Sequence, residues 1–222
     1  MKKTVYMYVV DTMADWETGY FLQGFTLQKM LVKPVYRFCT VGLSKNAIVT
    51  AGGVTIIPDC TIDEIKKDEV AALLLPGADV WMEAAQQKIL SLVSDLLSNG
   101  TVVAAICGAT LGLANMGILN SRQHTSNAVC FLSQLSTNYT GQAFYKDVSA
   151  VRDGNLITAS SAGGLLWARY ILESLDMYTK VTIEAWYSYF ATGDAKCFGI
   201  LMESFKDSSY HQESMEKNDE QI

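Results

Sequence analysis

Short apolar segments alternate with longer segments of helical periodicity along this chain, and this alternation constrains its fold more than any other feature. We expect buried strands at 4–10, 35–41, 71–75 and 101–106. We expect helices at 15–30, at 83–98, from 109 onward and at 162–175. Strands that are apolar throughout are buried on both faces, so helices must cover both sides of a mostly parallel sheet. The sequence therefore predicts an α/β fold.

Two short hairpins and one helix start are also marked in the sequence. Ala51-Gly52-Gly53 lies between two short apolar segments, and Asp153-Gly154-Asn155 lies between two more. Glycine-containing turns between such segments are typical of β-hairpins. Thr61 is followed three residues later by Glu64, which is the spacing of a capping box and predicts a short helix.

The length of 222 residues suits one large domain with an extension. We place the domain at 1–176 and a C-terminal helical extension at 177–205, which is rich in aromatic residues. These apolar side chains must cover the core of the domain or an interface, since large exposed apolar patches are rare on soluble monomers. Residues 206–222 are polar, with five acidic residues against two lysines, and we expect them to be disordered.

The composition argues against several kinds of partner. A net charge of −6 without a cluster of Lys and Arg argues against nucleic acid. No apolar run approaches the roughly 20 residues that span a bilayer. Five cysteines without CxxC spacing and only two histidines argue against structural zinc and favour a reducing compartment. We therefore expect a cytoplasmic protein that binds neither nucleic acid nor a membrane.

Cys107 occupies the junction between the expected strand at 101–106 and the helix that follows. A tight strand-to-helix turn of this kind crowds its neighbours, and small residues surround the cysteine at Ala105, Gly108 and Ala109. Free N–H groups at the helix N-terminus favour a thiolate, so we expect a pKa below the free-cysteine value of about 8.5. The alternative is an ordinary buried cysteine, but the small neighbours favour a nucleophile.

A cysteine nucleophile needs a base or a charged neighbour, and histidine is the usual choice. His124 follows the Cys107 helix by one short connection and is able to return beside the thiol. The other interpretation of His124 is a hydrogen-bonded loop residue without a catalytic role. His211 lies in the polar tail, where a solvated residue without a role is expected.

Three further residues are candidates for the same site. Glu17, if protonated, is able to donate a hydrogen bond to the thiolate; alternatively, it simply favours the dipole of the helix expected at 15–30. The N–H groups of Gly77 and Gly108 are candidate donors to a developing oxyanion. Pro76-Gly77 is equally well interpreted as a turn without a catalytic role.

These segments together resemble the DJ-1/PfpI family of the class I glutamine amidotransferase-like folds. The matching segments cover about residues 3–175 and are, in chain order, Asp15-Trp16-Glu17, Leu75-Pro76-Gly77-Ala78, the stretch 104–113 around Cys107, His124, and 155–160. The resemblance implies a flavodoxin-like sandwich and a homodimer. It assigns the nucleophile to Cys107, the thiol-partner carboxyl to Glu17, and the oxyanion site to Gly77 and Gly108.

The chain departs from the family pattern in one respect that bears on activity. Protease-like members carry a histidine directly after the cysteine, where this chain has Gly108. Amidotransferases carry a His-x-Glu pair late in the domain, and the corresponding stretch at 160–163 has no histidine. A protease triad and glutamine hydrolysis are therefore not expected, and Cys107 with His124 and Glu17 is the arrangement that remains.

The sequence thus predicts a cysteine nucleophile that acts on small carbonyl or acyl compounds, like an amidase, another hydrolase or a glyoxalase. The expected partner is a small-molecule electrophile, and no cofactor is needed. The alternative is a non-catalytic module of the same fold that responds to oxidation or binds a protein, as expected for the stress-response members of the family. In that case the helices of the extension engage the partner.

Overall fold

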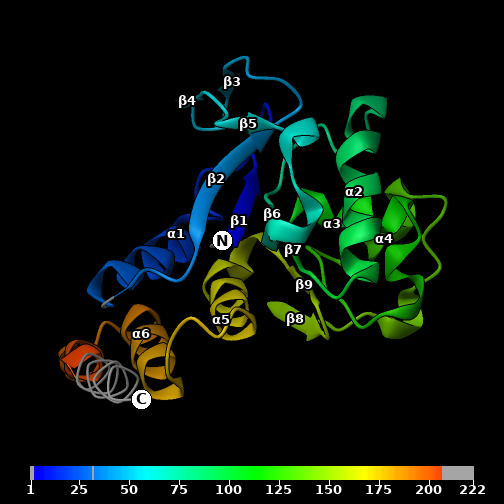
Figure 1. Ribbon diagram of the computed structural model, residues 1–222. Coiled ribbons are helices and arrows are strands. Elements are labelled where there is room, and N and C mark those ends of the chain that lie inside the picture. The colour runs from blue at the N-terminus through cyan, green and yellow to red at the C-terminus, as the bar shows by residue number, and fades with distance from the viewer. Residues whose placement is uncertain (1–2, 32, 207–222) are drawn as a thin grey trace.

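A seven-stranded sheet forms the centre of the computed structural model, which describes residues 3–31 and 33–206 (Figure 1). The strand order is β5-β2-β1-β6-β7-β9-β8, and all neighbours are parallel except β9 and β8. The strands are β1 (Thr4–Tyr8), β2 (Arg37–Gly42), β5 (Cys60–Thr61), β6 (Val70–Leu75), β7 (Val102–Ile106), β8 (Ala150–Asp153) and β9 (Leu156–Ala159). A separate hairpin pairs β3 (Ile48–Val49) with β4 (Thr55–Ile56).

Helices cover both faces of the sheet, as Figure 1 shows. One layer holds α2 (Gln87–Ser98), α3 (Gly108–Asn115) and α4 (Val129–Leu135). The other layer holds α1 (Gly19–Thr26) and α5 (Gly164–Ser174). Short 3₁₀ segments lie at Leu27–Met30, Ile62–Glu64, Lys67–Glu69, Ala84–Gln86, Ile118–Ser121, Gln142–Phe144 and Ser161–Gly163. The predicted α/β fold with a mostly parallel sheet between helices is confirmed.

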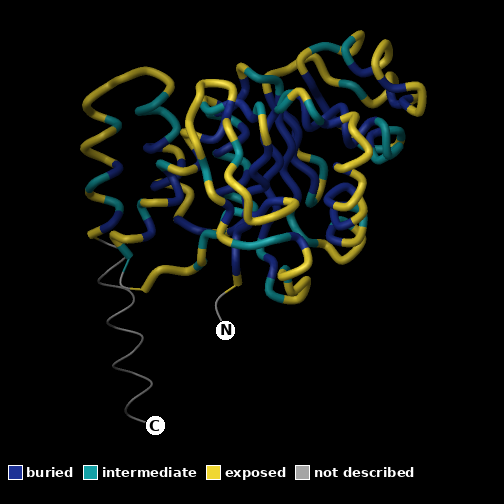
Figure 2. The backbone as a smooth tube through the Cα atoms, turned by 90° about the horizontal axis from the view of Figure 1, so that it is seen from above, coloured by how far each residue is buried: buried dark blue, intermediate teal, exposed yellow. Residues whose placement is uncertain are grey.

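The apolar pattern explains why the sheet lies in the middle. Leu73, Leu74 and Val103 on the central strands are fully buried. In α2, Ile89 and Val93 are also fully buried, four residues apart on one face of the helix, while its other face is exposed. Figure 2 shows the buried strands surrounded by exposed loops and outer helix faces. Burial of one such side chain contributes about 1.5–3 kcal/mol to folding.

The predicted hairpins and the capping box are also present. β8 and β9 pair antiparallel around the turn at 153–155, and β3 pairs with β4. Thr61 and Glu64 form the predicted capping box, with Thr61 N–H donating to Glu64 Oε2 at 2.8 Å. The sequence pattern did not indicate β5 or α4, which have only two and seven residues.

The C-terminal extension packs against the domain. It consists of α6 (Lys180–Thr192) and helical residues 195–206. Trp186 of α6 is 1% exposed, and its ring lies against Gly24 of α1, where an added methyl group would come within 3.2 Å of it. The extension therefore covers the core of the domain. The expected disorder of 206–222 falls, apart from residue 206, outside the described residues.

Candidate active site

Cys107 lies on a sharp turn between β7 and α3. Its φ of 56° and ψ of −124° are unusual for a residue with a side chain, and such strain typically costs about 1–3 kcal/mol. Surrounding hydrogen bonds hold the turn in place. Cys107 N–H donates to Ala159 O at 2.9 Å, and Thr110 donates to Cys107 O through its N–H at 3.1 Å and its hydroxyl at 2.6 Å. The sequence correctly predicted this strand-to-helix junction.

Two glycines allow the backbone to approach the cysteine closely. A methyl group at Gly108 would lie 2.5 Å from Ala78 O. A methyl group at Gly77 would lie 2.8 Å from Cys107 Cβ and 2.7 Å from Glu17 Oε2. Side chains at either position would push the loop after β6 away from the turn at Cys107, so these glycines bring the two strand ends together.

Glu17 is completely buried beside Cys107. Its Oε2 accepts a hydrogen bond from Gly77 N–H at 2.7 Å, and its Oε1 accepts one from the Ser161 hydroxyl at 2.9 Å. Burial raises the pKa of the Glu17 carboxyl, and the hydrogen bonds from Cys107, Gly77 and Ser161 partly offset the increase. Glu17 does not lie in the first turn of a helix as expected, because α1 begins only at Gly19.

Asn127 completes the group of side chains around the sulfur. Its Nδ2 donates to Cys107 Sγ at 3.2 Å, and its Oδ1 accepts from Ser161 N–H at 2.8 Å. Ser161 also contacts Glu17, so the three polar residues form one network beside the thiol. Neither Asn127 nor Ser161 was predicted from the sequence. For Ser161 the available signal was its position after the end of β9, since ligands bind at that edge of parallel sheets. Asn127 lies in the loop before α4, where the sequence offered no such signal.

Burial raises the pKa of the Cys107 thiol, contrary to the expected decrease. Hydrogen bonds from Asn127 and Ser161 oppose this increase, whereas the negative charge of Glu17 adds to it. That last contribution depends on the carboxyl being ionised. If Glu17 holds the proton instead, its charge disappears and its O–H is able to donate to the sulfur, so the two groups titrate as a pair.

His124 has partners other than Cys107. The imidazole is fully buried, with Nδ1 at 2.7 Å from Arg122 O and Nε2 at 2.8 Å from the Tyr139 hydroxyl. The rings of Tyr139 and Tyr145 pack edge-on against it, and burial lowers its pKa. In this structure the expected Cys107–His124 pair is not formed, because both ring nitrogens are already hydrogen-bonded. The geometry fits the alternative interpretation, a hydrogen-bonded loop histidine.

The backbone donors near Cys107 also differ from the expected pair. Gly77 N–H is engaged by Glu17, so it does not point to an incoming oxyanion. The amide of the next residue, Ala78, is a candidate instead. Its nitrogen lies close to Gly108, at 3.1 Å from the position that a methyl group on Gly108 would occupy. Gly108 is the first residue of α3, where N–H groups have no acceptor within the helix. Gly108 and Ala78 are therefore the candidate oxyanion donors.

A cavity of about 540 Å³ opens beside this network. Ser161 lines it together with Trp16, Tyr20 and Phe190. Trp16 Nε1 donates to the Ser161 hydroxyl at 3.2 Å, and the Phe190 ring packs edge-on against Tyr20 at 5.5 Å. Phe190 belongs to α6, so the C-terminal extension supplies part of the wall next to the candidate site.

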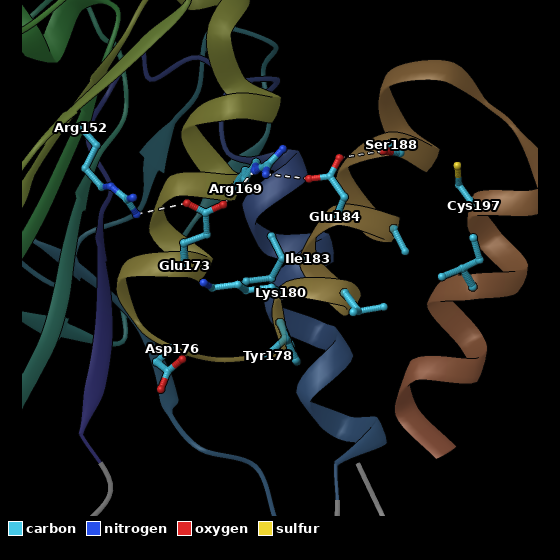
Figure 3. A pocket seen from close by; sticks show the side chains of 13 residues that line it. Arg152, Arg169, Glu173, Asp176, Tyr178, Lys180, Ile183, Glu184, Ser188 and Cys197 are labelled. Atoms are coloured by element: carbon cyan, nitrogen blue, oxygen red, sulfur yellow. Dashed lines mark hydrogen bonds and ion pairs between the residues drawn. The ribbon is translucent and has the colours of Figure 1, made fainter. Parts of the chain in front are cut away.

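A larger cavity of about 770 Å³ lies between α5, α6 and residues 195–206 (Figure 3). Its polar wall is a chain of ion pairs in which Arg169 joins Glu173 at 2.9 Å to Glu184 at 2.7 Å, and Arg152 joins Glu173 at 3.1 Å. Its lining includes none of the residues around Cys107. This cavity is therefore separate from the candidate active site.

No group of three or more His, Cys, Asp or Glu side chains in the described part of the chain is arranged to hold a metal ion. Over the same residues, the helices are too short or too polar to cross a bilayer.

The fold and the turn at Cys107 define a class of α/β proteins that carry a cysteine at the carboxyl edge of a parallel sheet. The model of the DJ-1/PfpI family matches residues 3–174, which is most of the chain. The chain belongs to the DJ-1/PfpI family, as its sequence motifs predicted.

Individual relatives extend this comparison. The chain is 41% identical over 202 residues to the Bacillus subtilis protein named "Uncharacterized protease YoaZ", covering 90% of this chain and 96% of that protein. The crystal structure of a thiJ/pfpI family protein from Bacillus anthracis has a TM-score of 0.86 and 38% identity, covering 92% of this chain and 97% of that one. "Deglycase TK1284" of Thermococcus kodakarensis is 27% identical, covering 65% of this chain and 90% of its own.

Proposed function

We propose that this protein is an enzyme in which the Cys107 thiolate attacks a small carbonyl or acyl compound. The observation that carries this proposal is the position of the sulfur, on a strained turn with Asn127 donating to it and the buried Glu17 carboxyl beside it. Energy stored in an unusual backbone conformation is typical of functional sites. The names of the relatives, a protease and a deglycase, support hydrolysis as the general reaction class.

The proposed reaction begins with transfer of the thiol proton from Cys107 to Glu17. The thiolate then adds to the carbonyl carbon, a C–S bond forms, and the π electrons move to the carbonyl oxygen. The N–H groups of Gly108 and Ala78 stabilise that oxyanion. With an acyl substrate, the intermediate collapses and expels a leaving group that takes the proton from Glu17, and water then hydrolyses the thioester. With an aldehyde, the oxyanion takes the proton to give a hemithioacetal.

Small substrates fit the site better than polypeptides. Cys107 is only half-exposed, and a small cavity of about 540 Å³ next to it is lined by Ser161 but not by Cys107 itself. The His124 imidazole is hydrogen-bonded elsewhere, and Gly108 stands where protease-like members carry a histidine. In the described part of the chain, therefore, no histidine is hydrogen-bonded to the sulfur.

The test is steady-state turnover of a small panel: a 2-oxoaldehyde, a thioester, an aryl ester and a peptide amide. We expect turnover of at least one of the first three, loss of that activity in Cys107→Ser, and none with the peptide. Turnover that survives in Cys107→Ser would overturn the assignment. If none of the panel reacts while peroxide oxidises Cys107, the non-catalytic redox-responsive alternative is favoured instead.

A further inference from the structure

A second pair of thiols lies far from the candidate active site in the sheet order. Cys39 of β2 and Cys60 of β5 have their sulfur atoms 3.5 Å apart, in hydrogen-bonding contact. Both side chains are half-buried, and β5 is the edge strand of the sheet. Both sulfurs also lie near Thr40 O, at 3.6 and 3.7 Å.

The sheet register explains this proximity. β2 and β5 are parallel, and Val41 lies opposite Cys60. Side chains alternate between the two faces of a strand, so Cys39 points to the same face as Val41. The two sulfurs therefore meet across neighbouring strands on one face of the sheet.

We propose that Cys39 and Cys60 form a redox-active dithiol, which closes to an intramolecular disulfide by exchange with a low-molecular-weight disulfide. A disulfide bond is about 2.05 Å long, so the sulfurs must approach by roughly 1.5 Å. The register places Cys39 diagonally from Cys60, so closure also requires a small backbone shift of β5, an edge strand of two residues. This site is independent of the function proposed for Cys107.

The exchange takes place in two steps. The Cys60 thiol loses its proton, and the thiolate attacks one sulfur of oxidised glutathione, which breaks the glutathione disulfide and releases one glutathione thiolate. The Cys39 thiolate then attacks Cys60 Sγ, forms the protein disulfide and releases the second glutathione. Two protons pass from the protein to the two released thiolates. The protein loses two electrons, and the small disulfide gains them.

The contacts of the pair assign the order of attack. After burial, which is the largest cause for both groups, the hydrogen bond between the sulfurs lowers the pKa of Cys60 and raises that of Cys39. The charges of Glu64 and Asp59 raise the pKa of Cys60, and that of Lys45 lowers it. Burial raises the pKa of both groups, and that of Cys39 reaches about 12. Because the thiolate is the reactive form, oxidation of this pair is expected to be slow.

The disulfide would link the two ends of a chain segment that contacts the loop before Glu17. The chain between Cys39 and Cys60 contains the β3–β4 hairpin, and this hairpin is hydrogen-bonded to residues 11–15. Thr12 N–H donates to Val49 O at 2.9 Å, and Ala51 N–H donates to Met13 O at 2.9 Å. Gly52 N–H donates to Asp15 Oδ2 at 2.6 Å. Oxidation would therefore tether the base of a hairpin that contacts the loop before Glu17.

The experiment uses the full chain with Cys107→Ser, so that the candidate nucleophile does not obscure the other thiols. Four cysteines remain of the five in the sequence. After incubation of the native protein with oxidised glutathione, free thiols are counted in denaturant and the disulfide is located by non-reducing peptide mapping. We expect two free thiols and a cross-linked pair of peptides that contain Cys39 and Cys60.

Control variants keep the result interpretable. In the Cys107→Ser background, a further Cys39→Ser or Cys60→Ser substitution should abolish the cross-link. A further Cys130→Ser substitution, at an exposed position, should leave the cross-link in place. Phenylarsine oxide, which bridges two neighbouring thiols, should add once to the parent protein and not to either of the first two variants. The proposal is overturned if all four thiols stay free and the arsenical does not bind, or if the disulfide joins other cysteines.

Discussion

Asn127 donates a hydrogen bond to the sulfur of Cys107 at 3.2 Å, while its carbonyl oxygen holds the backbone of Ser161 at 2.8 Å. One side chain therefore links the candidate nucleophile to the hydroxyl that contacts Glu17. Because the thiol is half-buried, a fixed donor of this kind matters more to the thiolate than it would in water.

Two substitutions of Asn127 separate its donation to the sulfur from its support of Ser161. Asn127→Leu removes both hydrogen bonds, and Asn127→Asp keeps an acceptor for Ser161 N–H but removes the donor to Cys107. Hydrogen bonds to charged groups contribute about 1.5–3 kcal/mol, so we expect acylation of Cys107 to slow by about tenfold or more in both variants. Stopped-flow measurement with an aryl ester gives the rates. Recovery of the parent rate in Asn127→Asp would show that support of Ser161, not donation to sulfur, is what matters.

The raised pKa of Glu17 makes stability depend on pH. Burial raises the carboxyl pKa in the folded protein above its unfolded value, which is about 4.3. The contribution of this group is therefore fully present below about pH 4.3 and is lost as pH rises through the folded-state value. Relative to Glu17→Gln, which does not titrate, the parent protein should lose stability over that range. Urea unfolding of both proteins in a Cys107→Ser background measures the difference. A difference in unfolding free energy that does not change with pH would contradict a raised pKa of the Glu17 carboxyl.

Gly108 should not tolerate a side chain. A methyl group there would lie 2.5 Å from Ala78 O, so Gly108→Ala must displace the backbone that carries the second candidate oxyanion donor. We expect a loss of about 1–3 kcal/mol in stability and reduced acylation of Cys107. Gly199 is the control, because nothing lies within 4 Å of a methyl group there and the helical position favours alanine. Thermal unfolding of the two variants should shift in opposite directions; equal shifts would argue against the close approach.

Trp186 should anchor the C-terminal extension to the domain. The indole is 1% exposed and donates from Nε1 to Gln23 Oε1 at 2.6 Å. Trp186→Ala is expected to cost about 3–5 kcal/mol, as for other large core residues. Val181 is the matched control on the same helix, since it is 60% exposed and its replacement by alanine should change stability by less than about 0.5 kcal/mol. Similar urea midpoints for parent and Trp186→Ala would mean that the extension folds separately.

The apolar pattern predicted most of the fold because buried strands and helix faces follow from local periodicity. The glycine turn at 153–155 and the capping box at Thr61 were predicted for the same reason, since each depends on residues close in sequence. The start of α1 was wrong by four residues, because tertiary hydrogen bonds hold the segment before Gly19 in a loop. Ala14 N–H, for example, donates to Gly77 O at 2.9 Å.

The candidate site was predictable only in part. Cys107 and Glu17 lie together because their strands end at the same edge of the sheet, which is a consequence of the fold class. The partners of each polar group were not predictable, because they are set by contacts between distant segments. His124 is hydrogen-bonded to the Tyr139 hydroxyl, and Gly77 N–H donates to the Glu17 carboxyl. The side-chain amide of Asn127 donates to the sulfur of Cys107.

The central claim is that Cys107 is the nucleophile, and the most direct test is to trap the covalent intermediate. The native protein is mixed with an aryl ester, quenched in acid within the first turnover and mapped by mass spectrometry. We expect one acyl group per chain, on Cys107, and none at the exposed Cys130. The Cys107→Ser variant should release no burst of the phenol. An acyl group on another cysteine, or an equal burst from Cys107→Ser, would contradict the account.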